Sequence, residues 1–421
     1  MARARVTRGD FARGTLAAAF LLLGGCGASP AAAPPASSAV VSPTAASDAG
    51  EAFTFPDAIA SPLGLRAVPD ALAPFLAPCD GGDAALSRLA ERFARRQSEG
   101  AAALDASEIN FALRAEGSPY VWPRAWTLEG GDLTSATAVE RMQAWLRGWS
   151  DGGARRCGVA LAETRGRQVL AAVAVDALAD LDPLPVRARA SSWIEVSARL
   201  LVPAADAKFV LLGPKGPPRS LPTSFDGERA RARFRADRAG PFLLQLLASV
   251  AGGPRPVLEA TVYADVEPPR SYFRDPAPGE PSVPLPRDAD GGEALLSMLN
   301  QARATEHSPP LRRDPRLDAV ALQHAEAMRQ QRRVAHDAGD GDHLTRLAAA
   351  GIDVIAAGEN VAHALDVTFA HRALWASPSH RENLLQPRFD AVGLGVVPDA
   401  DGSVWVCEVF ADVPEAARSP H

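Results

Sequence analysis

The eight histidines of this chain are confined to roughly its last quarter, and imidazole is the side chain best suited to metal binding and proton transfer near neutral pH. The first 306 residues contain none. One histidine lies in the stretch SPSHRENL, residues 377–384, between two serines and an arginine. Imidazole chemistry in this protein therefore belongs to the C-terminal part of the chain. The histidines are His307, His324, His336, His343, His363, His371, His380 and His421.

His380 is expected in the first turn of a helix. Ser377 is a favourable N-cap residue, and Pro378 suits the first helical position because its missing N–H would lack a helical partner there anyway. His380 is then the third helical residue, where the helix dipole disfavours imidazolium by about 0.3–1 kcal/mol. A neutral imidazole is the form that binds a metal or a polar ligand. A histidine that only caps its own loop is an equally good interpretation of this stretch alone.

The absence of known hydrolase motifs favours binding over catalysis. The sequence contains no HExxH, no GxSxG and no paired Cys–His motif. Ser377 and Ser379 adjoin His380, but close neighbours on one helical turn rarely form a nucleophile–base pair. Whether the chain is an enzyme stays open, with the balance against it.

An α-then-β block after residue 290 must position these histidines. An apolar stripe over 294–302 predicts one helix, and the pair Asp314-Pro315 predicts the start of another. His324 lies on the apolar face of the second helix, where a hydrogen-bonded core histidine is more plausible than a ligand. Residues 393–410 predict two strands around an Asp-Gly turn. Surface or local hydrogen-bonding positions are expected for His307, His343, His363 and His371.

Several motifs of this block stand in a distinctive order: VAHDAG at 334–339, AAGENVA at 356–362, WASPSHRENL at 375–384, and GLGVV and VWVCEVF in the hairpin. The series resembles the bacterial branch of the CAP superfamily, which groups cysteine-rich secretory, antigen 5 and pathogenesis-related 1 proteins. The resemblance spans residues 291–414. It implies a CAP domain folded as an α/β/α sandwich, with helices on both faces of a small sheet.

The family resemblance also implies a site. CAP proteins line a cleft with two histidines and two glutamates, and His336, Glu359 and His380 match three of these. The second glutamate has no counterpart, because Trp375 is followed by Ala-Ser-Pro. Two histidines and a carboxylate with an open fourth position would suit zinc. Glu359 could instead simply fix a turn. The expected supporting residues are Asn360, Ser377, Arg381 and Asn383.

The N-terminus predicts export. Residues 1–14 carry four arginines and one aspartate, and a short apolar run follows, as in a signal peptide over residues 1–25. Leu23-Gly24-Gly25-Cys26 resembles a bacterial lipobox, which implies cleavage before Cys26 and its lipidation. Gly27 in place of aspartate favours the outer membrane, with ordinary secretion as the alternative. Residues 26–64 are rich in Ala, Ser and Pro and are expected to be a disordered tether.

An α+β multidomain protein is expected beyond the tether. Short strands over 188–267 predict an immunoglobulin-like β-sandwich, followed by a proline-rich linker at 268–290. In this middle block Ala230, Ala232, Phe234 and Ala236 alternate with arginines, which predicts a sheet with one buried and one solvated face.

Residues 65–185 show an internal similarity to the last block. GVALAETRGRQVLAAVAV at 158–175 aligns with GLGVVPDADGSVWVCEVF at 393–410, which has the same length. LSRLAERFA at 86–94 aligns with LDAVALQHA at 317–325. Histidines and the GEN and SPxHR motifs are missing, which predicts a degenerate CAP-like domain. Cys79 precedes the first helix and Cys157 begins the hairpin, so a disulfide between them is expected. Cys407 is then a buried free thiol.

Three functions are compatible with these patterns. The favoured one is a cell-envelope or secreted binding module whose His/Glu cleft holds a metal ion, lipid, glycan or other small ligand. The alternatives are a metal-dependent hydrolase and a purely structural envelope module. Loss of residues 1–25 would change the net charge from −6 to −9. An acidic exported protein is a poor candidate for nucleic-acid binding, so the expected partners are the membrane, through Cys26, and a small ligand.

Overall fold

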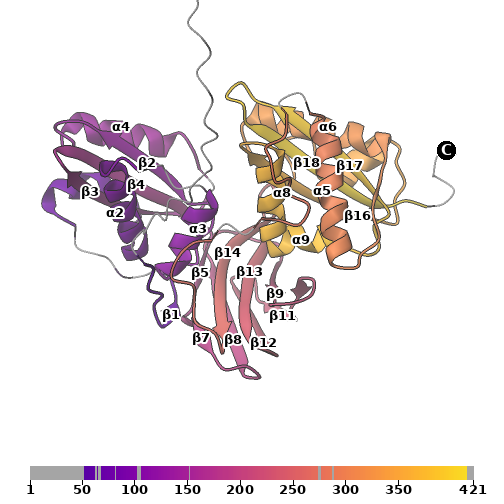
Figure 1. Cartoon of the computed structure of the whole chain (residues 1–421), viewed down its shortest axis with the longest axis horizontal. Coiled ribbons are helices and arrows are strands. Elements are labelled where there is room, and N and C mark those ends of the chain that lie inside the picture. Colours follow the sequence, from indigo (N-terminus) through magenta and orange to yellow (C-terminus); the bar gives the residue numbers. More distant parts are fainter. Residues whose placement is uncertain are drawn as a thin grey trace, which may run out of the picture. The chain divides into compact units, whose positions relative to one another are not determined.

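The chain divides into two units, Met1–Ala49 and Gly50–His421, and the computed structural model in Figure 1 describes parts of the second. The described residues are 52–61, 64, 68–80, 82–101, 106–150, 152–273, 276–286 and 289–414. The predicted signal peptide, Cys26 and most of the predicted tether lie outside these ranges. Within them, no helix is both long enough and apolar enough to span a membrane.

The first block contains a three-stranded antiparallel sheet, in the order β2-β4-β3, between two layers of helices. On one face Leu86, Leu89 and Phe93 pack against the sheet, and on the other Phe75 and Met142 do so. The elements are η1 (Asp70–Leu72), α1 (Ala73–Leu76), α2 (Ala84–Ser98), α3 (Ala106–Ala115), β2 (Arg124–Glu129), α4 (Ala136–Arg147), β3 (Ala154–Thr164) and β4 (Arg167–Ala177).

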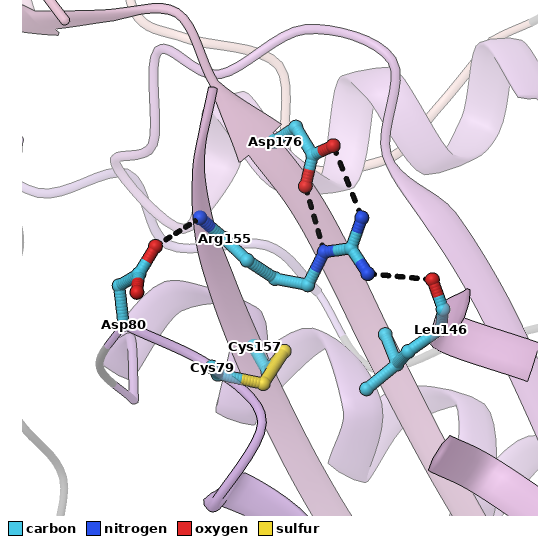
Figure 2. Close-up of a disulfide and its surroundings, with 6 residues drawn as sticks. All are labelled: Cys79, Asp80, Leu146, Arg155, Cys157 and Asp176. Carbon is cyan, nitrogen blue, oxygen red and sulfur yellow. Dashed lines mark hydrogen bonds and ion pairs between the residues drawn. A yellow bond between two sulfur atoms is a disulfide. The ribbon is translucent and has the colours of Figure 1, made fainter. Parts of the chain in front are cut away.

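A disulfide ties the segment before α2 to strand β3 (Figure 2). The Sγ atoms of Cys79 and Cys157 lie 2.01 Å apart, and the bond closes a sequence separation of 78 residues. Beside it the Arg155 guanidinium donates to both carboxylate oxygens of Asp176, from Nε at 2.7 Å and Nη2 at 3.1 Å. Among the described cysteines Cys407 alone is free, and it is buried.

The middle block consists of two sheets over one shared core, in the orders β10-β9-β13-β14-β7 and β11-β12-β8-β5. In β12 the predicted alternation holds: Ala230 and Phe234 are buried, while Arg231 bonds Asp226 at 3.1 Å and Arg233 stacks over a tryptophan ring. Strand β1 (Ala58–Ile59) pairs with β6. The strands are β5 (Ala179–Leu181), β6 (Leu184–Pro185), β7 (Arg187–Ala188), β8 (Trp193–Leu200), β9 (Ala207–Leu212), β10 (Arg219–Ser220), β11 (Thr223–Phe225), β12 (Arg229–Arg235), β13 (Gly240–Val250) and β14 (Gly253–Ala264).

The last block is a three-layer α/β/α arrangement around a four-stranded sheet, in the order β15-β17-β18-β16. Helix α6 covers one face, and α5, α8 and α9 cover the other. Asp314 caps α6 with Pro315 in its first turn, as its sequence predicts. The elements are α5 (Gly291–Thr305), β15 (Arg312–Arg313), α6 (Pro315–Gln331), α7 (His343–Ala349), β16 (Ala356–Ala364), α8 (Val367–Ala376), α9 (Pro378–Leu385), β17 (Ala391–Pro398) and β18 (Val404–Asp412).

The segment before α5 packs closely on the last block. His371 Nε2 lies 3.0 Å from the Pro278 carbonyl oxygen, and the Glu280 carboxylate binds the Arg372 guanidinium through both oxygens. His371 is fully buried and its hydrogen bond reaches a residue far away in the sequence, so the expected surface or local hydrogen-bonding position was wrong. At least this stretch of the predicted proline-rich linker is therefore fixed to α8.

The first and last blocks share a close helix–strand approach. A Cβ added to Gly158 in β3 would lie 2.1 Å from the carbonyl carbon of Leu86 in α2. A Cβ added to Gly393 in β17 would lie 2.1 Å from the carbonyl carbon of Leu317 in α6. These glycines and leucines are the same pairs that the internal sequence similarity aligns. Only a residue without a side chain permits such contact.

The start of each of these helices is also built alike. Asp83 caps α2 and Asp314 caps α6 through their carboxylates. The Asp83 backbone N–H donates to the Cys157 carbonyl at 2.9 Å, and that of Asp314 donates to the Val392 carbonyl at 3.0 Å. Each acceptor directly precedes one of the two glycines. Gly82 forms a parallel bridge with Cys157 of β3, and β15 likewise pairs in parallel with β17.

Candidate functional site

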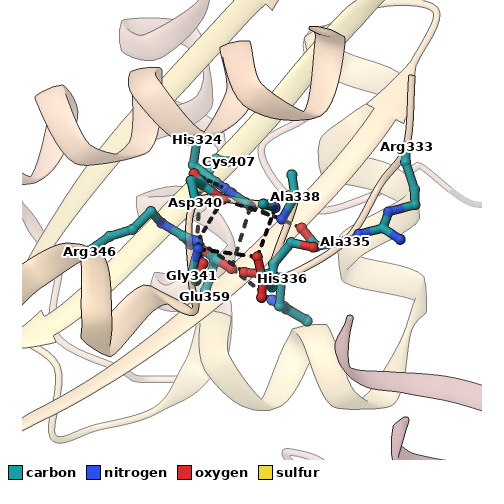
Figure 3. A network of polar contacts seen from close by, with 12 residues as sticks. His324, Arg333, Ala335, His336, Ala338, Asp340, Gly341, Arg346, Glu359 and Cys407 are labelled. Carbon is teal, nitrogen blue, oxygen red and sulfur yellow. Dashed lines mark hydrogen bonds and ion pairs between the residues drawn. The ribbon is translucent and has the colours of Figure 1, made fainter. Parts of the chain in front are cut away.

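Glu359 is the centre of a buried polar network in the last block (Figure 3). It lies on β16, and its side chain is inaccessible to solvent. His336, in the loop between α6 and α7, places Nδ1 2.8 Å from Glu359 Oε1. The Arg346 guanidinium from α7 binds the other oxygen, Oε2. Sequence reasoning brought His336 and Glu359 together through the family resemblance, but it missed Arg346.

The Glu359 carboxyl is ionised in this environment. Burial raises its pKa, but the hydrogen bond and charge of His336 and the charge of Arg346 lower it by more, so the net shift is downward. A carboxylate stabilised in this way is a weak proton acceptor. Its two oxygens are committed to an imidazole and a guanidinium, so Glu359 is better suited to orienting His336 than to abstracting a proton.

His324 anchors the loop that carries His336. Its ring is fully buried on α6, with Nδ1 2.8 Å from Asp340 Oδ2 and Nε2 2.9 Å from the Ala335 carbonyl oxygen. A carboxylate and a carbonyl oxygen therefore hold the two ring nitrogens. The ring thus connects the two ends of the loop, as Figure 3 shows. This is the hydrogen-bonded core histidine that its position on the apolar stripe predicts.

His380 lies in the first turn of α9, after the N-cap Ser377 and Pro378, as predicted. Burial, and then the charge of His336, lower its pKa to about 3. The imidazole is therefore neutral, but burial is the main cause rather than the helix dipole. Its Nδ1 is buried and has no hydrogen-bond partner in the structure.

The predicted supporting residues hold the segments of Glu359 and His380 together. Asn360 Nδ2 donates to the His380 carbonyl at 3.2 Å, and Asn383 Nδ2 donates to the Glu359 carbonyl at 3.0 Å. Arg381 donates from Nε to the Trp375 carbonyl at 2.6 Å, and its guanidinium lies over the tryptophan ring. These contacts brace the two backbone segments. Ser377 departs from expectation, because its side chain does not cap α9.

A metal ion would find two imidazoles rather than three preformed ligands here. Among the described residues, no group of three or more His, Cys, Asp or Glu side chains has the geometry to hold a metal. Both oxygens of Glu359 already have protein partners. His336 engages its carboxylate through Nδ1, and a second-shell carboxylate on one ring nitrogen is the usual companion of a histidine that binds metal through the other. The residues therefore fit a cation held by His336 and His380 with Glu359 behind them.

Two more side chains lie near Glu359, although the sequence predicted neither as a site residue: Cys407, which was expected only as a buried free thiol, and His343. The Cys407 Sγ lies 3.5 Å from Glu359 Oε2, and burial raises the pKa of this thiol well above its usual value. His343 begins α7, and its pKa is lowered by burial, with further effects from the charges of Glu359 and His336. A thiol with a raised pKa is a poor nucleophile. Cys407 therefore acts as a packed neighbour of the carboxylate.

Glu408 is a carboxyl group buried beside this network. It is fully inaccessible on β18, and its Oε2 accepts from Asn360 Nδ2 at 3.1 Å, while Oε1 has no partner in the structure. Burial raises its pKa to about 7, and the hydrogen bond from Asn360 lowers it by less. A single acidic residue inside the apolar run VWVCEVF was the sequence signal for such a group.

Replacing Glu408 with glutamine is expected to make stability less sensitive to pH. The folded protein retains the Glu408 proton up to about pH 7, whereas the unfolded chain loses it near pH 4.5. The wild type is therefore stabilised at low pH, and this stabilisation is lost as the pH rises towards 7. The free energy of unfolding of Glu408→Gln minus that of the wild type should increase by about 2–3 kcal/mol between pH 5 and pH 8.

Urea unfolding at several pH values measures this difference. Glu326→Gln is the matched control, because Glu326 is partly exposed on α6 and its pKa is lowered to about 2, mainly by its hydrogen bond with Arg329. Its carboxylate stays ionised across this range, so the control difference should not vary with pH. A pH-independent difference for Glu408→Gln would show that Glu408 is not protonated in the fold.

Comparison with known proteins identifies the last block. Residues 296–409 match the family model described as the cysteine-rich secretory protein family, CAP. Similar solved structures include an outer surface protein of Borrelia burgdorferi, with 21% identity over 30% of this chain and 93% of that one and a TM-score of 0.28. An extracellular SCP-domain protein of Bacillus anthracis has 18% identity over 56% of this chain and 86% of that one, with a TM-score of 0.27. A cysteine-rich secretory protein of Staphylococcus aureus has 12% identity over 56% of this chain and 83% of that one, with a TM-score of 0.26. No curated protein matches.

Proposed function

We propose that the CAP domain which residues 296–409 form is a non-enzymatic binding module, whose cleft holds a metal ion or another small polar ligand. The observation that carries the proposal is the contact between His336 Nδ1 and the buried carboxylate of Glu359 at 2.8 Å. This contact fixes the ring and commits one of its nitrogens. His380 is uncharged and lies close enough for His336 to affect its pKa. Zinc takes imidazole nitrogens as ligands, so two imidazoles from separate segments suit a borderline-soft cation of this kind.

In this proposal the residues have distinct roles. His336 and His380 are the direct ligands, while Glu359 orients His336 and adds negative charge close to the cation. Arg346 holds Glu359 in place, and Asn360 and Asn383 fix the backbone next to His380. A bound zinc would supply a positive centre for an anionic or polar ligand at its open positions. Glu359 was expected from the sequence as a third ligand, and we propose the orienting role instead because both of its oxygens are occupied.

Zinc binding should depend on the two histidines together. The double variant His336→Ala/His380→Ala is expected to lower zinc affinity at least about 100-fold, because each loss removes a direct ligand. Isothermal titration calorimetry of the full chain with zinc measures the affinity. The control is His307→Ala/His363→Ala, which removes two histidines of the same domain outside the cleft. Equal affinity in the two double variants would exclude the proposed ligands.

A metal-dependent hydrolase is the second candidate, favoured only by the open positions that two protein ligands would leave. The lowered pKa of Glu359 and its pairing with Arg346 make it a poor general base. Ser377 Oγ contacts Gln245 and Ser379. Ester and peptide substrates assayed with and without a chelator distinguish this candidate, which predicts hydrolysis that the chelator abolishes. A purely structural module predicts neither zinc binding nor hydrolysis.

We further propose a location in the cell envelope. The lipobox-like Cys26 supports an outer-membrane lipoprotein, with secretion as the alternative, and the similar structures include an outer surface protein and an extracellular protein. The mass of the mature chain tests this, because acylated Cys26 would add the mass of fatty acids to a chain beginning at residue 26.

The other two domains are proposed to be structural. For the middle block, the two sheets over one shared core support an immunoglobulin-like sandwich. The first block is proposed to be a degenerate CAP-like copy, which the paired glycine contacts, the paired aspartate caps and the equivalent sheet order support. The internal similarity aligns Phe93 with His324. Phe93 is also a buried ring, but it lacks the nitrogen atoms through which His324 forms hydrogen bonds.

A further inference from the structure

The first turn of helix α9 is capped by a residue of the middle block. Ser377 stands at the N-cap position but makes no side-chain capping bond. Instead the Ser379 backbone N–H donates to Gln245 Oε1 at 3.0 Å, and Gln245 Nε2 lies 3.1 Å from Ser377 Oγ. The first N–H groups of a helix have no partner within the helix, so an acceptor from elsewhere must supply one. His380 directly follows the residue that Gln245 holds.

Gln245 is fixed in one orientation for this task. It is fully buried on β13, and its Nε2 also donates to Glu259 Oε1 at 2.6 Å. An ionised carboxylate only accepts hydrogen bonds, so the Gln245 amide must present its nitrogen to Glu259 and its oxygen to Ser379. The Glu259 carboxylate is in turn paired with the Arg114 guanidinium from α3. A continuous polar chain thus runs from the first block through the middle block to the helix of His380.

The turn between β13 and β14 contacts His336, the other proposed metal ligand. The Gly252 carbonyl accepts a hydrogen bond from the Asp337 backbone N–H at 3.2 Å, directly after His336. Gly253 has a φ of 109°, and a Cβ added there would lie 2.8 Å from the His336 Cβ. The turn can lie this close only because position 253 lacks a side chain.

We infer that the middle block is a built-in support of the CAP cleft, with Gln245 and Gly253 as positioning residues for His380 and His336. The inference rests on the proposed function for its binding readout. It gives the middle block a specific task, which is to set the two imidazoles at a fixed separation. Both contacts reach the residue next to a cleft histidine or the histidine itself, and they come from one hairpin.

Gln245→Ala and Gly253→Ala, made in the full chain, test this inference. Each is expected to weaken zinc binding about tenfold, the effect typical of losing an outer-shell partner. Gly227→Ala is the matched control for glycine, because Gly227 has a φ of 95° in the same block and nothing lies within 4 Å of its added Cβ. Ser220→Ala is the control for Gln245, since its hydroxyl also donates to a residue of α9, Glu382 at 3.2 Å, but Glu382 does not adjoin His380. Both controls should bind zinc as the wild type does.

Amide hydrogen exchange gives a second readout that needs no ligand. Loss of the Gln245 acceptor should speed exchange of the Ser379 amide about tenfold, and Gly253→Ala should do the same for the Asp337 amide. Thermal unfolding of each variant against its control separates positioning from general loss of stability. Unchanged exchange at both amides, or zinc affinities equal to those of the controls, would overturn the inference. If the wild type itself binds no zinc, the proposed function fails and the exchange result alone decides the inference.

Discussion

Replacing Glu359 with alanine is expected to lower the free energy of unfolding of the last domain by about 3–5 kcal/mol. The change takes the nearer carboxylate from the buried Arg346 guanidinium and leaves it the more distant carboxylate of Asp340, 3.5 Å from Nη1. A buried charge that loses its main partner costs far more than the intact pair contributes. His336 would also lose the partner of its Nδ1.

Urea unfolding compares this variant with Glu326→Ala, in which a partly exposed pair with Arg329 is lost and the expected change is much smaller. Adding Arg346→Met to Glu359→Ala should recover part of the stability, because the buried charge is then absent. A loss below about 1 kcal/mol for Glu359→Ala would contradict the buried network described above.

Removing the disulfide with Cys79→Ala/Cys157→Ala is expected to lower the free energy of unfolding of the first block by about 4 kcal/mol. The bond closes 78 residues of chain, and a loop of that length gains much conformational freedom in the unfolded state when it is opened. Tryptophan fluorescence reports the transition, because Trp126, Trp145 and Trp149 pack in the same cluster as Cys157.

Reductant supplies the control for this prediction. A reducing agent should lower the unfolding midpoint of the wild type towards that of the double variant and leave the variant unchanged. Equal midpoints for oxidised wild type and variant would mean that the bond does not constrain the unfolded chain.

Local sequence signals predicted the features that depend on neighbouring residues. The start of α6 follows from the capping preference of Asp314 and from the proline after it. The start of α9 lies where Ser377 and Pro378 predict it, although the Ser377 side chain makes no capping bond. The alternation along β12 follows from strand geometry. The family resemblance, rather than any spacing, brought His336 and Glu359 to one site.

Features that depend on distant contacts could not be predicted. Arg346 follows no motif, and its role depends on the fold carrying α7 to β16. The role of Gln245 depends on a strand of the middle block meeting α9. Gln245 in PFLLQLLASV and Glu408 in VWVCEVF share one usable signal, because each is a lone polar residue inside an apolar strand. Such a residue is either buried with a hydrogen-bond partner or lies where another element packs on the strand, but the sequence does not identify that partner.

A zinc-soaked crystal measured at the zinc absorption edge tests the central claim most directly. The account predicts one anomalous peak in the cleft, about 2.0–2.1 Å from a ring nitrogen of His336 and of His380. Glu359 should remain on Nδ1 of His336, outside the zinc coordination sphere. Zinc bound elsewhere in the domain, or a cleft left without a peak at saturating zinc, would contradict the account.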